Sequence, residues 1–277
     1  MIRGTTELIA HIGYPTETFK SPLIYNPWFE QTGVDAVVVP MGCREPHYAA
    51  FLKAVFTLTN IRGALITMPH KVATVALLDE ASPAVRIAGA CNAVRRAADG
   101  RLQGDLFDGE GFVRAARRKG ARTEGARALV VGCGGVGSAI AASLGASGVA
   151  SLSLFDTRAG AAQALAERLA RFHPVLKIST GSNDPAGHDL VVNATPMGMN
   201  ESDPMPMDAA RIAPGAFVGE VVMKQEMTAF LKAASARGCR HLVGIDMVFE
   251  QIPAYLEFFG FPAATPQALR AVARVSY

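Results

Sequence analysis

The sequence predicts an α/β protein with two domains, each built around a sheet of mostly parallel strands. Short apolar runs that suit buried strands alternate with helical stretches, and this alternation starts near the N-terminus and again after residue 127. The 277 residues, of which 50% are hydrophobic and 18% charged, suffice for two domains that each bury a core. These proportions exclude an intrinsically disordered chain.

The first half of the chain alternates strands and helices. Apolar runs over 7–13, 34–40 and 61–67 predict three strands, with helices over 22–32 and 47–57 between them. Beyond these we expect helices over 72–78 and 83–88, a short strand over 92–95, a loop over 104–111 and a basic helix over 109–119.

The alternation restarts in the second half. We expect strands over 128–131, 151–155, 189–193, 216–222 and 241–244, and helices over 136–147 and 159–171. The tail over 246–274 has helical spacing, but periodicity does not tell on which half it packs. The domain boundary is expected between Asp108 and Arg127.

The segment 128–155 carries no charge and is long enough to cross a bilayer. Its six glycines and five serines, and its division into strand, turn, helix and strand, argue against a membrane span. The N-terminus lacks an apolar secretory core followed by a small-residue cleavage site, so no export is expected.

Charge and cysteine usage narrow the function classes. The net charge is only +3 and the basic residues are scattered, so nucleic acid is not an expected partner. The four cysteines form no C-x-x-C pair and the six histidines are dispersed, so no metal site is expected. Reduced thiols in an apolar protein of this size predict a cytoplasmic location.

The turn 132–137 (GCGGVG) fits the pattern G-x-G-x-x-G, follows an apolar strand and opens a helix. Gly132 permits the tight turn, Gly134 lets a pyrophosphate approach the backbone, and Gly137 allows close packing of helix on strand. Gly135 and Val136 complete the predicted dinucleotide contact. The alternative is a purely structural turn.

Asp156 lies 24 residues after Gly132 (156 − 132), near the position of the acid that binds a ribose 2′-hydroxyl. A carboxylate here repels the extra phosphate of NADP, so NAD is the expected cofactor and NADP the less favoured one. Arg158 tempers this expectation, because it can offset the repulsion by pairing, stack on adenine, or face solvent.

Six segments in order across nearly the whole chain give a specific pattern. They are 20–22 (KSP), 67–71 (TMPHK), 89–92 (GACN), 104–109 (GDLFDG), 193–199 (NATPMGM) and 244–251 (GIDMVFEQ). The ordered set resembles the shikimate dehydrogenase family, which includes quinate/shikimate dehydrogenases.

The resemblance implies a substrate-binding α/β domain, a Rossmann NAD(P)-binding domain, and C-terminal helices that return to the first domain. The domains would then be 1–108 with 246–277, and 109–245. It also implies reversible hydride transfer between a nicotinamide and a hydroxyl-bearing ring carbon of a cyclic hydroxy acid such as shikimate or quinate, in a monomer or homodimer.

The catalytic pair that the resemblance implies is Lys71 and Asp108. Oxidising an alcohol to a ketone requires removal of the hydroxyl proton, and a desolvated lysine can be tuned to accept it. The alternative is that both side chains are solvated or form a weak surface pair. His70, beside the lysine, is interpreted as a packing residue or as a residue that supports the catalytic groups from behind.

The resemblance implies further contacts. Substrate would be held by Ser21, Thr67, Asn92 and Gln251, and the cofactor by Thr195 and Met199. Met199 and Met247 would form apolar walls of the site. The alternatives are a helix N-cap for Ser21, a turn residue for Asn92, and core packing for Met199 and Met247.

The substrate side departs from the family pattern, because residues that usually form hydrogen bonds are replaced by apolar ones. The replacements are Phe19, Leu65, Leu106, Phe107 and Met223. The expected function is therefore an NAD-preferring dehydrogenase for shikimate or quinate. The alternatives are a paralogue for a less polar or amino-shikimate-like substrate, and a dinucleotide-dependent sensor without turnover.

Overall fold

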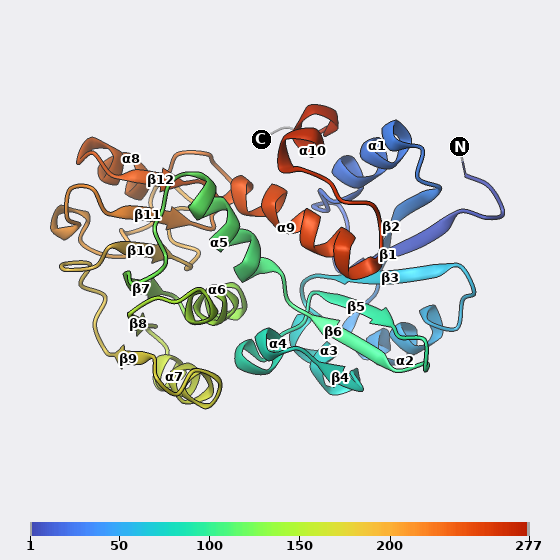
Figure 1. Cartoon of the computed structure of the whole chain (residues 1–277), viewed down its shortest axis with the longest axis horizontal. Coiled ribbons are helices and arrows are strands. Elements are labelled where there is room, and N and C mark those ends of the chain that lie inside the picture. The colour runs from blue at the N-terminus through green and yellow to red at the C-terminus, as the bar shows by residue number, and fades with distance from the viewer. Residues whose placement is uncertain (1, 276–277) are drawn as a thin grey trace. The chain divides into compact units, whose positions relative to one another are not determined.

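The chain, described here over residues 2–275 by a computed structural model, divides into two units (Figure 1). Among the described residues, the first unit contains 2–85, Gly89–Phe107 and 252–275, and the second contains Arg86–Ala88 and Asp108–Gln251. Residues 246–251, expected in the first domain, cluster with the second. They lie on helix α9 (Gly244–Phe259), whose first turns pack on α5 (Asp108–Arg118).

The sheet of the first unit has the order β2-β1-β3-β5-β6-β4. The strands β1 (Glu7–Gly13), β2 (Ala36–Gly42) and β3 (Ile61–Ile66) are parallel. β5 (Ala93–Arg96) runs antiparallel to β3 and to β6 (Leu102–Asp105), which pairs in parallel with the short β4 (Glu80–Ala81). The expected loop over 104–111 is therefore wrong: β6 and the start of α5 occupy most of it.

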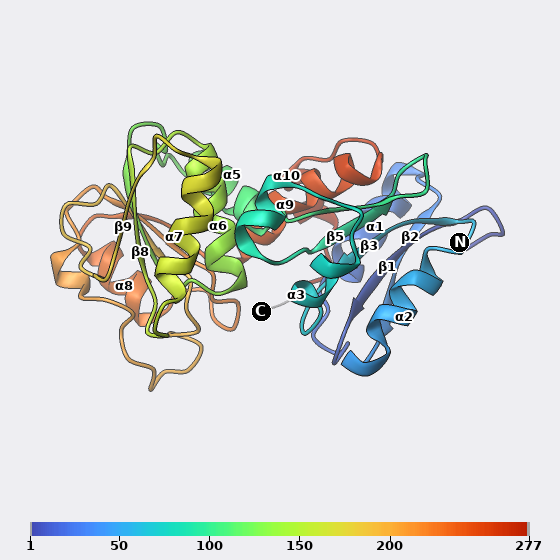
Figure 2. The same cartoon turned by 90° about the horizontal axis from the view of Figure 1, so that it is seen from below.

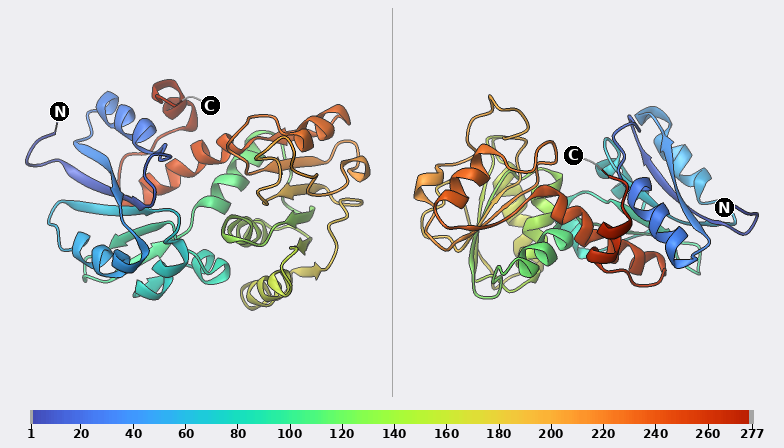
Figure 3. Two further views of the ribbon diagram at one scale, coloured as in Figure 1. Left: turned by 180° about the vertical axis from the view of Figure 1, so that it is seen from behind. Right: turned by 90° about the horizontal axis from the view of Figure 1, so that it is seen from above.

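The first unit places helices on both faces of β1, β2 and β3 (Figure 2). They are α1 (Pro22–Thr32) on one face and α2 (Glu45–Val55) on the other. The third expected helix is short, α3 (Lys71–Thr74), and continues as a 3-10 turn over Val75–Leu77. α4 (Pro83–Ala88) precedes β5. The last helix, α10 (Pro266–Val272), lies beside α1 (Figure 3).

The sheet of the second unit is parallel throughout, with the order β12-β11-β10-β7-β8-β9. Its strands are β7 (Arg127–Val131), β8 (Ser151–Phe155), β9 (Lys177–Thr180), β10 (Leu190–Asn193), β11 (Phe217–Glu220) and β12 (Arg240–Leu242). This is the doubly wound order of dinucleotide-binding domains, with its switch point between β7 and β10. β9 was not predicted, because an edge strand with three polar residues lacks an apolar pattern.

Helices cover both faces of this sheet. α6 (Gly135–Ala146) and α7 (Ala161–Phe172) lie on one face, and α8 (Ala229–Ala236) on the other (Figure 2). The uncharged segment 128–155 forms β7, α6 and β8. Over the described residues 2–275, no helix combines the length and apolar character that a membrane span requires.

Candidate active site

The glycine turn of the second unit joins β7 to α6. Some of its glycines are required by the fold, and others leave space for a ligand. A side chain on Gly137 would overlap the carbonyl oxygen of Gly132, and one on Gly132, whose φ is +99°, would lie 2.7 Å from the backbone of Ala194. Side chains on Gly134 or Gly135 would meet no protein atom within 4 Å. The fold therefore requires the first and last glycines, and the middle two leave open space at the start of α6, as bound phosphates need.

Val136, in the first turn of α6, is partly buried and packs its side chain against the core of the second unit. Helix-terminal amides have no partner within the helix and bind anions readily. The residues present at this turn therefore fit the pyrophosphate of a dinucleotide.

Asp156 follows β8 and its carboxylate is held by two residues, Cys133 and Arg158. Its carboxylate accepts a 2.7 Å hydrogen bond from the Cys133 amide and a two-point bond, 3.1 Å each, from the Arg158 guanidinium. The hydrogen bonds from Arg158 hold the pKa of Asp156 down to about 2, against the opposing effect of burial. Arg158 is thus paired with Asp156 itself, although most of its side chain, 66%, remains exposed.

The motif after β10 is held by a buried polar network. Asn193 accepts hydrogen bonds from the amide and hydroxyl of Thr195, at 3.1 and 2.6 Å, and its own amide donates to Glu220 at 3.1 Å. Thr228 also donates to Glu220, at 3.0 Å, and burial raises the pKa of this carboxyl. The Thr195 hydroxyl also accepts a hydrogen bond from the Met197 amide. It therefore stabilises the conformation of the loop, in addition to the cofactor contact predicted for it.

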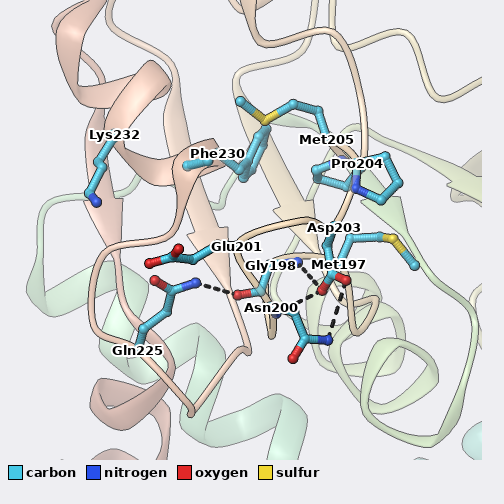
Figure 4. A pocket seen from close by; sticks show the side chains of 12 residues that line it. Met197, Gly198, Asn200, Glu201, Asp203, Pro204, Met205, Gln225, Phe230 and Lys232 are labelled. Atoms are coloured by element: carbon cyan, nitrogen blue, oxygen red, sulfur yellow. Dashed lines mark hydrogen bonds between the residues drawn. The ribbon is translucent and has the colours of Figure 1, made fainter.

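A pocket of about 180 Å³ lies beside this loop in the second unit (Figure 4). Asp203 accepts hydrogen bonds from the amides of Gly198 and Asn200, and Gln225 donates to the Gly198 carbonyl, at 2.6 Å. These bonds fix the loop that carries Thr195 and the exposed Met199. We interpret the residues that line the pocket as structural support for this loop. Met247, by contrast, packs in the core, as its alternative interpretation expected.

Asp108 lies on α5 and Gln251 on the part of α9 that belongs to the second unit, and the two helices approach closely at glycines of α5. A side chain on Gly111 would lie 2.6 Å from Cβ of Gln251, and one on Gly109 would overlap the Ala139 backbone of α6. Asp108, the first residue of α5, is buried, and Oε1 of Gln251 is buried without a partner. Ion pairs Arg118–Glu250 and Lys119–Asp246 join the same two helices.

Three predicted residues of the first unit lie where β3 ends. The Thr67 amide donates to the Ile12 carbonyl of β1 at 3.0 Å, and the Ile66 amide donates to the Asn92 carbonyl at 2.8 Å. The Lys71 carbonyl accepts from the Cys91 amide at 2.8 Å. The backbone thus brings Thr67, Lys71 and Asn92 to one end of the sheet.

Asn92 combines a structural and a free polar group. It is only 1% exposed, and its Oδ1 accepts a 3.0 Å hydrogen bond from the Phe107 amide, directly before Asp108. Its Nδ2 is buried without a partner. Buried polar groups are nearly always hydrogen-bonded, so an unpartnered amide here fits contact with a substrate hydroxyl.

Ser21 precedes α1 and is half-buried. It occupies the N-cap position of α1, as the alternative interpretation expected, but its side chain makes no capping hydrogen bond. The preceding loop folds back onto β1, because a side chain on Gly13 would meet both Thr67 and, at 2.9 Å, the ring of Phe19. This loop carries Ser21 toward the same part of the first unit.

Three of the five apolar departures are buried in the core, and Phe19 and Met223 are partly buried. Leu65, Leu106 and Phe107 are all buried, and Phe107 packs edge-on against Tyr255 and Phe258. Met223 lies against Gly244. His70 is also a packing residue: it stacks on Tyr48 at 3.9 Å between ring centroids and hydrogen-bonds the Cys43 carbonyl at 2.7 Å.

His11 was missed by the sequence analysis. It lies on β1, is 7% exposed, and stacks on Phe19 with ring centroids 4.0 Å apart. Burial, and then the charge of Lys71, lower its pKa to about 4. A lone histidine in a strand carries no sequence signal of this kind, because its neighbours are set by tertiary structure.

The lowered pKa of His11 predicts a loss of stability in mild acid. Between about pH 6.5 and pH 4 the unfolded chain binds a proton at this position that the folded chain refuses, so unfolding becomes more favourable as the pH falls. A shift of this size corresponds to about 3 kcal/mol across the window. Urea unfolding followed by the fluorescence of Trp28, the single tryptophan and a buried residue of the first unit, measures it.

His11→Phe keeps the stacking on Phe19 and removes the proton site. We expect the acid-induced loss to be smaller in this variant by most of that amount. Parallel curves for the two proteins from pH 7 to pH 4 would contradict this account of His11.

Among the described residues 2–275, no three His, Cys, Asp or Glu side chains gather as a metal site requires. The residues described above instead suit a dinucleotide at the glycine turn and a hydroxylated ligand near Lys71.

Comparison with known proteins agrees with this chemistry. A family model described as the shikimate dehydrogenase substrate binding domain matches residues 11–94. A shikimate dehydrogenase (NADP(+)) of Acidiphilium cryptum is 34% identical over 275 residues, 99% of this chain and 98% of that protein. One from Rubrobacter xylanophilus is 35% identical over 254 residues, 90% and 89% of the two chains.

Solved structures show the same fold over nearly the whole chain. Shikimate 5-dehydrogenase from Listeria monocytogenes, in complex with shikimate and NAD, is 27% identical with a TM-score of 0.91, covering 98% of this chain and 97% of that one. Quinate dehydrogenase from Corynebacterium glutamicum, in complex with NAD, is 29% identical with a TM-score of 0.85, covering 96% and 98%. The chain is therefore an NAD(P)-dependent oxidoreductase that belongs to the shikimate dehydrogenase family.

Proposed function

We propose that the protein reversibly oxidises a ring hydroxyl of a shikimate- or quinate-type cyclic hydroxy acid to the ketone, with NAD as the preferred cofactor. The observation that carries the proposal is the placement of Thr67, Lys71 and Asn92 at one end of the first sheet, with the Asn92 amide buried and without a protein partner. Small polar groups of this kind hold a hydroxylated ring without adding charge.

In the proposed reaction the Lys71 side chain is the group that accepts the proton of the reacting hydroxyl as the carbon–hydrogen bond breaks. The bound nicotinamide supplies the acceptor for the hydride. Asp108 is the carboxylate that we assign to the catalytic pair. Ser21, Thr67, Asn92 and Gln251 hold the acid through its carboxylate and the hydroxyls that do not react.

The preference for NAD rests on Asp156. Its carboxylate is held by the Cys133 amide and its low pKa keeps it charged at neutral pH. A 2′-phosphate beside it would be repelled by this negative charge. The Arg158 guanidinium, which could bind the phosphate, is already hydrogen-bonded to Asp156. The L. monocytogenes and C. glutamicum structures contain NAD, whereas the A. cryptum and R. xylanophilus relatives are named for NADP(+).

Replacing Asp156 by asparagine tests this preference. We expect kcat/KM for NADP to rise about tenfold relative to that for NAD, because the variant removes the repulsion and releases Arg158 toward a phosphate. Steady-state kinetics with both cofactors measures the ratio. Asp184→Asn, which frees Arg211 from a similar exposed pair, is the matched control. A wild-type protein that already prefers NADP would contradict the assignment.

The substrate class is tested by the absorbance of the reduced cofactor with shikimate and with quinate. Turnover of either acid supports the proposal. Dinucleotide binding without turnover of any cyclic hydroxy acid would favour a sensor instead.

A second candidate is a paralogue that takes a less polar or amino-shikimate-like acid. It is favoured by the apolar side chains of Phe19, Leu65 and Leu106, because each substrate group left unpaired on burial costs about 1–3 kcal/mol. A panel of cyclic acids with fewer hydroxyls, or with an amine, separates the two.

The four buried thiols lead us to place either enzyme in a reducing, cytoplasm-like compartment.

A further inference from the structure

His11 lies among the residues of the proposed substrate site. Its Nδ1 atom makes no hydrogen bond that would stabilise the fold. In the register of the first sheet His11 pairs with Leu65 of β3, so the two side chains point to the same face. The ring stacks on Phe19 at 4.0 Å, and the positive charge of Lys71 acts on it. The Thr67 amide bonds the carbonyl of Ile12, the next residue on β1, so His11 lies near the end of the sheet that carries Thr67 and Lys71.

The buried nitrogen needs a partner that the protein does not provide. Nδ1 is buried without a hydrogen bond, although the residue is 7% exposed. An unsatisfied buried nitrogen is costly and rare, and at a ligand site it marks a contact that the ligand completes. Phe19, which stacks on the ring, and Leu65, its register partner on β3, have side chains without a hydrogen-bonding group.

We propose that His11 is a substrate-contacting, specificity-determining residue whose Nδ1 hydrogen-bonds a ring hydroxyl of the cyclic hydroxy acid. The inference rests on the proposed function and adds to it a recognition group that the family pattern does not supply. His11 thereby replaces part of the polarity that Phe19 and Leu65 remove.

A hydroxyl suits this imidazole better than a charged group. The pKa of about 4 keeps the ring neutral at working pH, and a neutral imidazole offers one donor and one acceptor. A hydroxyl can be either partner, so it satisfies Nδ1 in both tautomers. Phe19 holds the plane of the ring, which fixes the direction of the hydrogen bond.

The test compares His11→Phe, which keeps a stacked ring, with His11→Gln, which keeps a hydrogen-bonding group. We expect His11→Phe to lower kcat/KM for the substrate about tenfold to hundredfold, mainly through KM, and His11→Gln to recover part of the loss. His173→Phe is the matched control, because it removes another unpartnered buried imidazole nitrogen, in the second unit, and should leave kcat/KM within twofold.

Single-deoxy analogues of the substrate separate a contact from a packing effect. If His11 binds one hydroxyl, the analogue without that hydroxyl loses about tenfold with the wild type and almost nothing with His11→Phe. A loss that instead follows the carboxamide analogue of the acid overturns the hydroxyl assignment. Values of kcat/KM within twofold for every acid in folded His11→Phe overturn the whole inference.

The imidazole 15N signals of His11 keep this test distinct from that of the proposed function. If the wild type turns over neither shikimate nor quinate, the proposed substrate class fails, and the same acids are then used as ligands. A shift of the His11 signals at saturation, absent for His173, supports the contact. Unchanged His11 signals overturn it, whatever the activity.

Discussion

Lys71→Ala is expected to lower kcat for hydride transfer by about 10²- to 10⁴-fold, because it removes the group that accepts the hydroxyl proton. The residues that we assign to the dinucleotide all belong to the second unit, whereas Lys71 belongs to the first. The variant should therefore bind NAD with unchanged affinity. Initial rates with saturating acid and cofactor, beside calorimetric titration with NAD, measure both quantities.

A control variant and a measurement of folding show whether a loss of activity is specific to Lys71. Lys53→Ala removes an exposed lysine from α2 in the same unit and should leave kcat within twofold. Trp28 fluorescence shows whether the first unit of Lys71→Ala is folded, because Trp28 is buried there. A folded Lys71→Ala protein that retains a third or more of wild-type kcat would assign the proton transfer to another group.

The sequence predicted the two-sheet α/β architecture because its strands are apolar runs separated by glycine turns and helices. The prediction failed for strands whose residues do not form an apolar pattern. β6 contains Gln103 and Gly104 and therefore resembles a loop, yet Gly104 is tight against Leu78 and Cys91. Short strands of this kind are set by the neighbours with which they pair, which sequence periodicity does not contain.

The candidate site divides in the same way. The glycine turn and Asp156 follow from local spacing, and the structure gives each a physical reason. The placement of Arg158 was left open among three interactions, and its pairing with Asp156 depends on side-chain geometry. His11 could not be found from sequence, because its importance arises only when β1 pairs with β3 and the loop with Phe19 folds back.

The glycines of the turn should fail in different ways when replaced by alanine, which gives the second large effect. A Cβ on Gly137 would overlap the Gly132 carbonyl, so α6 must move away from β7. We expect the free energy of unfolding of the second unit to fall by about 3 kcal/mol or more. Hydrogen exchange of the β7 and β10 amides measures it, and Trp28 fluorescence should report an unchanged first unit.

Gly134→Ala is the matched variant, because its φ of −76° suits alanine and its Cβ would enter space that holds no protein atom. Its stability should change by less than about 1 kcal/mol, since an N-cap glycine contributes little. Its affinity for NAD should nevertheless fall at least about tenfold, because the added methyl group occupies the space that the pyrophosphate needs. Equal NAD affinity in Gly134→Ala and wild type would show that the open space does not hold phosphates, and would leave the turn a purely structural connection.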